Sequence, residues 1–412
     1  MASKSKQARM KQMKKNEPAT LAVLIAVVTA TLALLQNRYG QFSDIRGFYG
    51  LHFVDGLHHW PFSTHTLQGS TEAMHPVEYP ALTGLIMWLF SFFIKPSQLA
   101  VFDYFKLTAV FHIALFAGTT YLIKRLSGRT WAIIFAVCPA VLYSLNRNWD
   151  IWAVITMIWA IYLFERGKTR QSAVVLSISI ATKFFPLVLL LPIAIQYFRQ
   201  RELKKFFEYL GITVASWAVI NLPFALVNFR GWSYFYEFNY KRGLGSASFY
   251  EIVGRLGSTY SFTNISFYAL NLFIFGAVTA YFLLSKNYLP LSEAAFFTMF
   301  AFILFNKQYS MQYIIWLTAL AVMALSKLNK RHQSIAIVSF VVWQVFDLLF
   351  QYAFFQNILT NTYATTATPV SPAISNHAYG VIGGIRYLVA VGFFLVLGYF
   401  LYSEKKAASS IK

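Results

Sequence analysis

The sequence predicts an all-α polytopic membrane protein, a single bundle of about 12 transmembrane helices. Three observations lead to this fold class. The chain of 412 residues is 57% hydrophobic and only 12% charged, with a mean hydropathy of +0.51, whereas ordinary soluble domains carry about 25% charged residues. Apolar runs of helical length recur from end to end. Lysine and arginine also gather in the short segments between alternate runs.

The apolar runs form twelve membrane crossings if the N-terminus is placed in the cytoplasm. This arrangement puts 23 of the 35 lysines and arginines in the inner segments and the two tails, although the outer loops are much longer. Basic residues are enriched on the cytoplasmic side, so we expect both termini to be cytoplasmic. The expected crossings are at about residues 18–36, 104–124, 131–144, 151–165, 171–182, 185–197, 207–228, 264–285, 291–305, 313–326, 333–355 and 380–402.

The chain is expected to hold one membrane domain, residues 18–403, between a basic cytoplasmic tail at 1–17 and a second cytoplasmic tail at 404–412. The first tail lacks a cleavage-site pattern, so it is interpreted as a cytoplasmic flank and not as a signal peptide. The net charge of +20 therefore indicates contact with the bilayer and not with nucleic acid, because its basic residues flank membrane segments. Cys138 is the one cysteine, which excludes an intrachain disulfide.

Two large loops are expected on the outer face, at residues 37–103 and 229–264. The apolar run at 81–94 lies within the first loop and is short for a crossing. Counting it as a crossing would also invert every later loop. We therefore expect 81–94 to form a helix on the outer membrane surface.

Ionisable residues at a membrane edge are costly and need a reason. Asp44 lies only a few residues beyond the first crossing, and other short polar motifs reach the same outer side. Together they are expected to form a cavity that binds an anionic headgroup through lysines and activates a hydroxyl through a carboxylate. The motifs are "FSDIRGFY" with Asp44, "HPVEYP" with His75, Glu78 and Tyr79, "NRNWD" with Asn148 and Asp150, "ATKFFP" with Lys183, and "FNKQYSMQY" with Lys307 and Gln308.

Each motif also has a plainer interpretation. Lys183 and Lys307 can be snorkelling anchors at helix ends. Asp44 can be a solvated loop residue or a helix cap. The "NRNWD" segment can be a capping turn, and "HPVEYP" can simply start the surface helix, since proline is accepted in a first turn.

Five of the eight histidines lie in the first outer loop, near Asp44, Asp55 and Glu78, which raises the alternative of a divalent metal site. Their spacing matches no compact helical ligand pair such as i, i+4, so no metal ligands are assigned. Asp55 is interpreted as a solvated residue. The five are His52, His58, His59, His65 and His75.

A resemblance rests on these motifs. A cytoplasmic N-terminus, one crossing and a long outer loop with an early acidic residue resemble the GT-C superfamily of membrane glycosyltransferases. Within it, the chain is similar to the polyprenyl-phosphate-mannose-dependent mannosyltransferases of glycosyltransferase family 87, mostly of actinobacteria. The matching motifs extend from Asp44 to Trp316 and are "FSDIRGFY", "EYPALTGLIMWL", "NRNWD", "ATKFFPLVLLLPI" and "FNKQYSMQYIIWL".

The resemblance implies a GT-C-like helical bundle and a set of site residues. Asp44 matches the first-loop acid that such enzymes use as catalytic base. Glu78 and Tyr79 match the segment that opens the surface helix and lines the acceptor or sugar cavity. Lys183, Lys307 and Gln308 match basic and amide positions that suit the donor phosphate. The second acid often adjacent to the first is absent, because Ser43 and Ile45 flank Asp44; no cofactor is therefore expected, with a divalent metal as the alternative.

The implied reaction moves a hexose, by family default mannose, from a polyprenyl-phosphate sugar to an extracytoplasmic acceptor such as a cell-envelope glycolipid or glycan. The donor phosphate is already a good leaving group, so the enzyme has to deprotonate the acceptor hydroxyl and stabilise the departing phosphate. Asp44 is expected to do the first, and Lys183, Lys307, Arg38 or Arg147 the second, in a single displacement with inversion.

Two other classes of function stay open at the level of sequence. A transporter or flippase of a lipid-linked or ionic substrate places ionisable groups near the middle of the membrane, and Asp347, in the middle of a crossing, favours that alternative. A noncatalytic membrane scaffold is the other, although it leaves the outer-face ligand candidates without a role.

Overall fold

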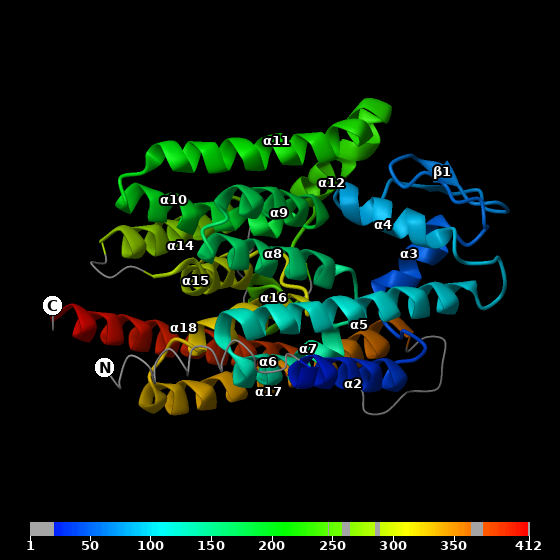
Figure 1. Ribbon diagram of the computed structural model, residues 1–412. Coiled ribbons are helices and arrows are strands. Elements are labelled where there is room, and N and C mark those ends of the chain that lie inside the picture. Colours follow the sequence, from blue (N-terminus) through cyan, green and yellow to red (C-terminus); the bar gives the residue numbers. More distant parts are fainter. Residues whose placement is uncertain (1–19, 246, 258–263, 285–288, 364–373, 411–412) are drawn as a thin grey trace.

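The computed structural model describes residues 20–245, 247–257, 264–284, 289–363 and 374–410. Regular structure in these ranges is almost entirely helical. Most helices lie roughly parallel along one axis, with α3, α4 and β1 at one end of the bundle and the end of α18 at the other (Figure 1). The prediction of an all-α polytopic bundle is confirmed.

Each expected crossing coincides with a helix or with a pair of helices. Four of these helices, α5, α11, α17 and α18, are long and apolar enough by themselves to span a bilayer. The helices are α2 (Thr20–Gln36), α5 (Ala100–Ser127), α6 (Arg129–Ala136) with α7 (Pro139–Ser144), α8 (Asp150–Glu165), α9 (Thr169–Thr182), the 3₁₀ helix η1 (Phe185–Leu189) with α10 (Leu190–Arg199), α11 (Leu203–Val227), α14 (Asn264–Leu284), α15 (Leu291–Leu304), α16 (Tyr313–Leu325), α17 (Lys330–Tyr363) and α18 (Asn376–Ser410).

The expected crossing 131–144 is divided into α6 and α7, and prolines lie in the first turns of α7 and η1. Pro139 occupies the first turn of α7, and Pro186 the first turn of η1, positions where the missing N–H costs no helical hydrogen bond. Lys183 lies in extended backbone in the short connection between α9 and η1, where two expected crossings meet.

The two segments that were expected to form outer loops contain short helices and one hairpin. The first holds α3 (Asp44–His52), the antiparallel strands β1 (His65–Thr66) and β2 (Ala73–Met74), and α4 (Ala81–Ser91). The surface helix expected at 81–94 is therefore present and slightly shorter. The second loop holds α12 (Phe229–Lys241), capped by the Asn228 side chain, and α13 (Phe249–Arg255), capped by Ser248.

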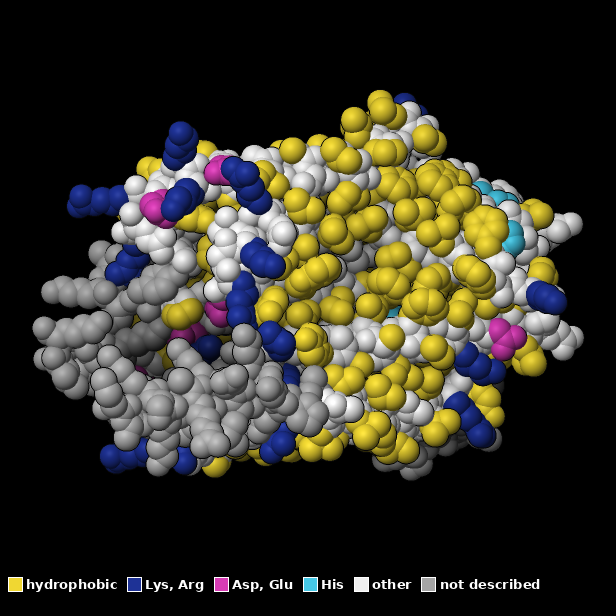
Figure 2. All heavy atoms as spheres, viewed as in Figure 1, with side chains coloured by type: hydrophobic (Ala, Val, Ile, Leu, Met, Phe, Trp, Pro, Cys, Tyr) yellow, Lys and Arg dark blue, Asp and Glu magenta, His cyan; other side chains and the backbone are white. Residues whose placement is uncertain are grey.

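The centre of the bundle is formed by α15 and α16, which are buried along nearly their whole length. Both are hydrophobic on all sides, the pattern of a helix surrounded by other helices. On the outside, apolar side chains cover the middle of the molecule, and Lys and Arg gather toward its two ends (Figure 2). This surface fits a protein whose middle part is surrounded by lipid.

Asp347 has a partner that the sequence did not reveal. The carboxylate lies on α17 and accepts a 2.9 Å ion pair from Arg386 on α18. Gln351 donates to the same carboxylate at 3.1 Å. Both charged side chains are completely buried. The partner was not obvious from the sequence, because the cation comes from the next helix of the chain.

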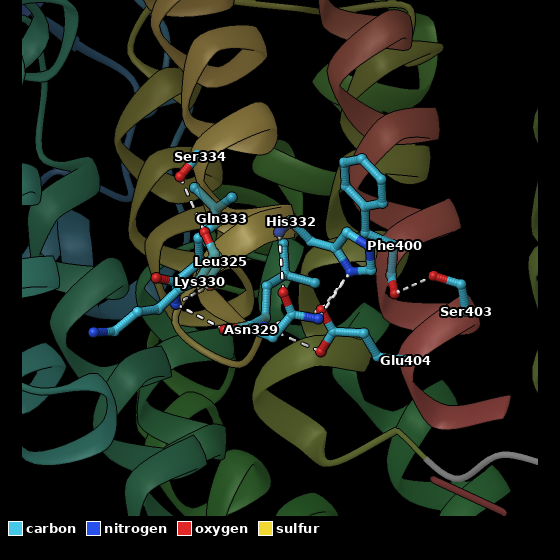
Figure 3. Close-up of polar contacts among 10 residues, drawn as sticks. Leu325, Asn329, Lys330, His332, Gln333, Ser334, Phe400, Ser403 and Glu404 are labelled. Carbon is cyan, nitrogen blue, oxygen red and sulfur yellow. Dashed lines mark hydrogen bonds and ion pairs between the residues drawn. The ribbon is translucent and has the colours of Figure 1, made fainter. Parts of the chain in front are cut away.

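The other end of the bundle is closed by contacts between α17 and α18 (Figure 3). Glu404 accepts hydrogen bonds from the backbone N–H of Asn329 at 2.9 Å and from the His332 ring at 2.6 Å. The same ring stacks on Phe400, with 4.5 Å between centroids. These contacts fix the start of α17 against the last turns of α18, far from α3.

Candidate active site

Asp44 is the first residue of α3, and the turn before α8 holds it in place. Its backbone N–H donates to the carbonyl of Arg147 at 2.8 Å. The Ser43 hydroxyl, which would otherwise be free to cap α3, donates to the carbonyl of Asn146 at 2.6 Å. Two motifs about a hundred residues apart in sequence, "FSDIRGFY" and "NRNWD", are thereby joined.

The Asp44 residue is exposed at its surface, although protein atoms crowd around the carboxyl. The carboxyl makes no hydrogen bond or ion pair within the ranges that the structure describes. The residue is exposed, while the surrounding protein removes enough water to raise the pKa of the carboxyl from 3.8 to about 6. Burial is the largest cause of the shift, Asp150 adds to it, and Lys183, Arg147 and Arg242 act against it. A carboxyl with these properties suits a general base at neutral pH.

Lys183 is paired with Asp150. Its ammonium group lies 2.8 Å from one carboxylate oxygen of Asp150, and the other oxygen accepts the indole N–H of Trp316 at 3.0 Å. Asp150 is almost completely buried, and the lysine side chain is 14% exposed. The positive charge of Lys183 is therefore largely neutralised where the sequence suggested a free cation, although it still acts on Asp44.

Aromatic rings enclose this pair from the side of α4. The Lys183 ammonium lies 4.9 Å from the centre of the Tyr79 ring and 5.8 Å from that of Tyr313. Tyr79 in turn packs edge-to-face against Trp149 and Phe48, at 5.6 and 5.2 Å between centroids. Tyr79 of the "EYP" motif therefore packs against the Lys183 ammonium.

Glu78 precedes Tyr79 in the chain and faces His75, with 3.5 Å between the imidazole and the carboxylate. Burial raises the pKa of the Glu78 carboxyl, and His75 and Arg242 lower it. The His75 ring also stacks on Tyr234 of α12, with 5.1 Å between centroids. This contact connects the first outer loop to the second.

Lys307 and Gln308 hold the chain that follows α12. The Lys307 ammonium donates to the carbonyls of Tyr240 and Arg242, at 3.0 and 2.9 Å. The Gln308 amide donates to the carbonyl of Gly243 at 2.8 Å, and the N–H of Gly245 returns a bond of 2.8 Å to the Lys307 carbonyl. These bonds form a latch that fixes segment 240–245.

Arg242 is the site residue that the sequence did not single out. The guanidinium acts on two carboxyl groups, lowering the pKa of both Asp44 and Glu78. The residue is exposed, and no ion pair to it occurs in the described ranges. In the sequence it is one of two adjacent basic residues in a long outer loop, and no pattern there separates it from Lys241, which pairs with Glu237.

Two residues of the predicted set have other surroundings. Arg38 is exposed and stacks over the neighbouring Tyr39 ring at 4.8 Å, apart from the group around Asp44. Asn148 is buried, and its side-chain oxygen accepts the N–H of Asp150 at 3.0 Å. Asn148 therefore stabilises the turn before α8, in which Trp149 is the N-cap residue.

The histidines of the first loop lie close to one another. His52 is 5.2 Å from His65 between ring centroids, and His59 stacks on His65 at 4.4 Å. Burial, with His65 and His75 nearby, lowers the pKa of His52 to about 3, which keeps the ring neutral. Among the described residues, no group of three or more His, Cys, Asp or Glu side chains is arranged to hold a metal ion.

The sequence from Glu78 onward decides the family. Residues 78–306 match the sequence model of glycosyltransferase family 87. The chain belongs to glycosyltransferase family 87. The matched segment contains Glu78, Tyr79, Asp150, Lys183 and Arg242, and it lies between Asp44 and Lys307. The protein is thus a membrane glycosyltransferase, as the resemblance implied.

A solved structure of ArnT from Cupriavidus metallidurans bound to undecaprenyl phosphate aligns with a TM-score of 0.48 at 13% identity. The alignment covers 94% of this chain and 78% of the ArnT chain. A search of the curated proteins finds no match.

Proposed function

We propose that this glycosyltransferase moves a hexose, mannose, from a polyprenyl-phosphate sugar to a glycolipid or glycan acceptor on the extracytoplasmic side of the cell membrane. The observation that carries the proposal is the Asp44 carboxyl, which is accessible, unpaired within the described ranges and has its pKa raised to about 6. The family supplies the reaction class. The donor type, the sugar, the acceptor and the side of the membrane are the proposed parts.

In the proposed reaction, Asp44 accepts the proton of the acceptor hydroxyl. At the same time the oxygen of that hydroxyl attacks the anomeric carbon of the donor sugar. The bond from that carbon to the phosphate oxygen breaks at the same time, and the electron pair leaves with the polyprenyl phosphate. One displacement inverts the anomeric carbon, and the proton on Asp44 is later lost to water. General base catalysis of this kind contributes about 10²–10⁴ in rate.

The departing phosphate needs positive charge, which the structure offers from arginine more than from lysine. Lys183 is neutralised by Asp150, and the Lys307 ammonium is occupied by two carbonyls. Arg147 and Arg242 both act on Asp44, and neither is paired with a carboxylate in the described part of the chain. We assign the phosphate-stabilising role to these two guanidinium groups, with Lys183 maintaining the charge balance around Asp44.

The proposal is tested in membranes with radiolabelled polyprenyl-phospho-mannose, with polyprenyl-phospho-arabinose as the competing donor. Wild type should form labelled product from the mannose donor. Asp44→Asn should transfer the sugar about 10²–10⁴-fold more slowly. Glu72→Gln is the matched control, because Glu72 is an exposed acid in the same loop. Transfer by Asp44→Asn at the wild-type rate would exclude Asp44 as the base, and transfer from the arabinose donor alone would replace mannose.

The transporter alternative loses the observation that favoured it. Asp347 is fully buried and paired with Arg386, so it is not a free carboxylate on an ion pathway. No other observation in the described ranges favours transport over transfer.

A further inference from the structure

A groove on the lipid-facing side of the bundle leads from mid-membrane depth to the turn that holds Asp44. It lies against α7, with α2 and α17 as its walls, and its volume is about 650 Å³. Its lining is mostly apolar below and polar at the upper end. The lining includes Thr29, Leu32 and Ala33 on α2, Leu348, Tyr352 and Phe355 on α17, and Phe42 and Arg147 at the upper end.

The walls of the groove are matched in depth and open to the side. The lining begins at Thr29 on α2 and at Leu348 on α17. Leu348 lies seven residues before Phe355, a distance of about 10 Å along the helix. Leu32 is 59% exposed and Tyr352 46%. Both helices coincide with membrane crossings, so these exposed side chains face lipid tails. The opening is therefore accessible to a molecule that diffuses within the bilayer.

The upper end of the groove carries a buried cation. The Arg147 guanidinium stacks on the Phe355 ring at 4.2 Å and donates one N–H to the carbonyl of Gln41 at 2.6 Å. The arginine is 6% exposed, and its Nε is buried without a hydrogen-bond partner in the described part of the structure. A buried N–H donor left unpaired costs free energy, so an anionic group at this position would satisfy both the charge and the donor.

The same end of the groove touches the catalytic turn. Phe42 stacks on Phe355 with 4.7 Å between centroids. Phe42 has a positive φ of 57°, a conformation that L side chains rarely adopt. Two residues later the chain reaches Asp44, whose N–H is held by the carbonyl of Arg147. Arg147 thus lines the groove with its side chain and holds the backbone of Asp44 with its carbonyl.

We infer that this groove binds the isoprenoid chain of the polyprenyl-phosphate donor, with the donor phosphate at Arg147. The inference rests on the proposed function and specifies where its lipid substrate lies. An apolar chain in the groove ends in an anionic headgroup at the one polar end, where Arg147 supplies the complementary charge. Arg242, which lowers the pKa of Asp44, is the second cation available to the departing phosphate. Tyr79 and Glu78 near α4 and α12 (Figure 1) are left to the acceptor.

The test measures binding of decaprenyl phosphate to the full chain in lipid nanodiscs, without turnover. Leu348→Trp and Ala33→Trp place a bulky ring in the lower groove from either wall. Each should weaken binding at least about tenfold, because every displaced methylene that was buried is worth about 0.8 kcal/mol. Leu349→Trp and Leu35→Trp are the matched controls. They lie next to the groove positions on the same helices, are 48% and 62% exposed, and should bind as wild type does.

A second comparison uses geranyl phosphate, whose short chain needs little of the lower groove. Arg147→Gln should weaken both ligands, whereas Leu348→Trp should weaken decaprenyl phosphate far more than geranyl phosphate. Equal binding of decaprenyl phosphate by wild type, Leu348→Trp and Ala33→Trp would overturn the groove assignment and leave the proposed function intact. Failure of wild type to bind decaprenyl phosphate at all would overturn both.

Discussion

Lys183 and Asp150 form a 2.8 Å ion pair at the edge of the bundle, between the interruption after α9 and the first residue of α8. Asp150 is held on its other side by Trp316. The pair is largely withdrawn from water, and the nearby Asp44 carboxyl has no partner within the described residues. The division of roles between two nearby carboxylates follows from this contact, since one is fixed by a cation and an indole and the other is free to accept a proton.

Removal of Lys183 alone should destabilise the protein. Lys183→Met leaves the buried Asp150 charge without its partner, a change that costs about 3–5 kcal/mol. Adding Asp150→Asn removes that charge and keeps an oxygen for the Trp316 N–H, so the double variant should recover much of the loss. Thermal or denaturant unfolding in detergent measures the effect. A single variant as stable as the double one would show that the pair contributes nothing.

The pH dependence of transfer should report Asp44. Because its pKa is raised to about 6, kcat/KM should fall as the pH drops through about 6, where the base becomes protonated, and should be constant above about 7. Arg242→Gln should move this acid limb to higher pH, because Arg242 lowers the pKa of Asp44. Arg230→Gln, an exposed arginine at the start of α12, is the control. An acid limb that does not move in Arg242→Gln contradicts the placement of Arg242.

Asp44→Asn should stabilise the protein at neutral pH while it abolishes transfer. A carboxyl whose pKa is higher in the folded state keeps its proton between pH about 4 and 6 while the unfolded chain has lost it, so stability falls as the pH rises through this window. Above about 6 the folded wild type carries the whole penalty, which asparagine lacks. The melting temperature of Asp44→Asn should therefore exceed that of wild type at pH 8, with the difference shrinking below pH 4. A lower melting temperature at pH 8 would show that Asp44 is a structural residue.

Much of the fold follows from the sequence because apolar length and basic flanks determine it locally. The helices lie where the apolar runs are, and the short run after Pro80 forms α4 as expected. The division of the expected crossing 131–144 into α6 and α7 is harder to foresee. Pro139 indicates where a helix begins, but only packing decides that the chain continues through the bundle.

The sequence predicted which residues form the site better than it predicted which of their charges are paired. Sequence motifs brought Asp44, Tyr79, Asp150 and Lys183 to one end of the bundle. They could not show that Lys183 is neutralised by Asp150, because the partners come from different helices. Arg242 was missed for the related reason that only the latch from Lys307 brings its loop toward Asp44.

The latch between Gln308 and segment 240–245 should be sensitive to a single methyl group. A Cβ at Gly245 would lie 1.7 Å from the Gln308 side-chain oxygen, whereas a Cβ at Gly243 would meet no atom within 4 Å. Gly245→Ala should displace Gln308 and the loop that carries Arg242, lowering kcat/KM by about tenfold or more. Gly243→Ala should behave as wild type. Transfer kinetics of the two variants, compared at equal folded protein, check this, and equal activities would exclude a role for the latch in positioning Arg242.

The buried pair of Asp347 and Arg386 should support the fold and not the chemistry. Asp347→Leu alone leaves an unpaired guanidinium between α17 and α18 and should cost about 3–5 kcal/mol of stability. Asp347→Leu combined with Arg386→Met replaces both charges by apolar groups, a change that is often neutral for stability. If Asp347 only stabilises the bundle, the folded fraction of the double variant should transfer sugar at the wild-type rate. The readout is turnover per folded molecule in proteoliposomes. A folded but inactive double variant would mean that the pair takes part in function, which would restore a mid-membrane ionisable group as a candidate for transport.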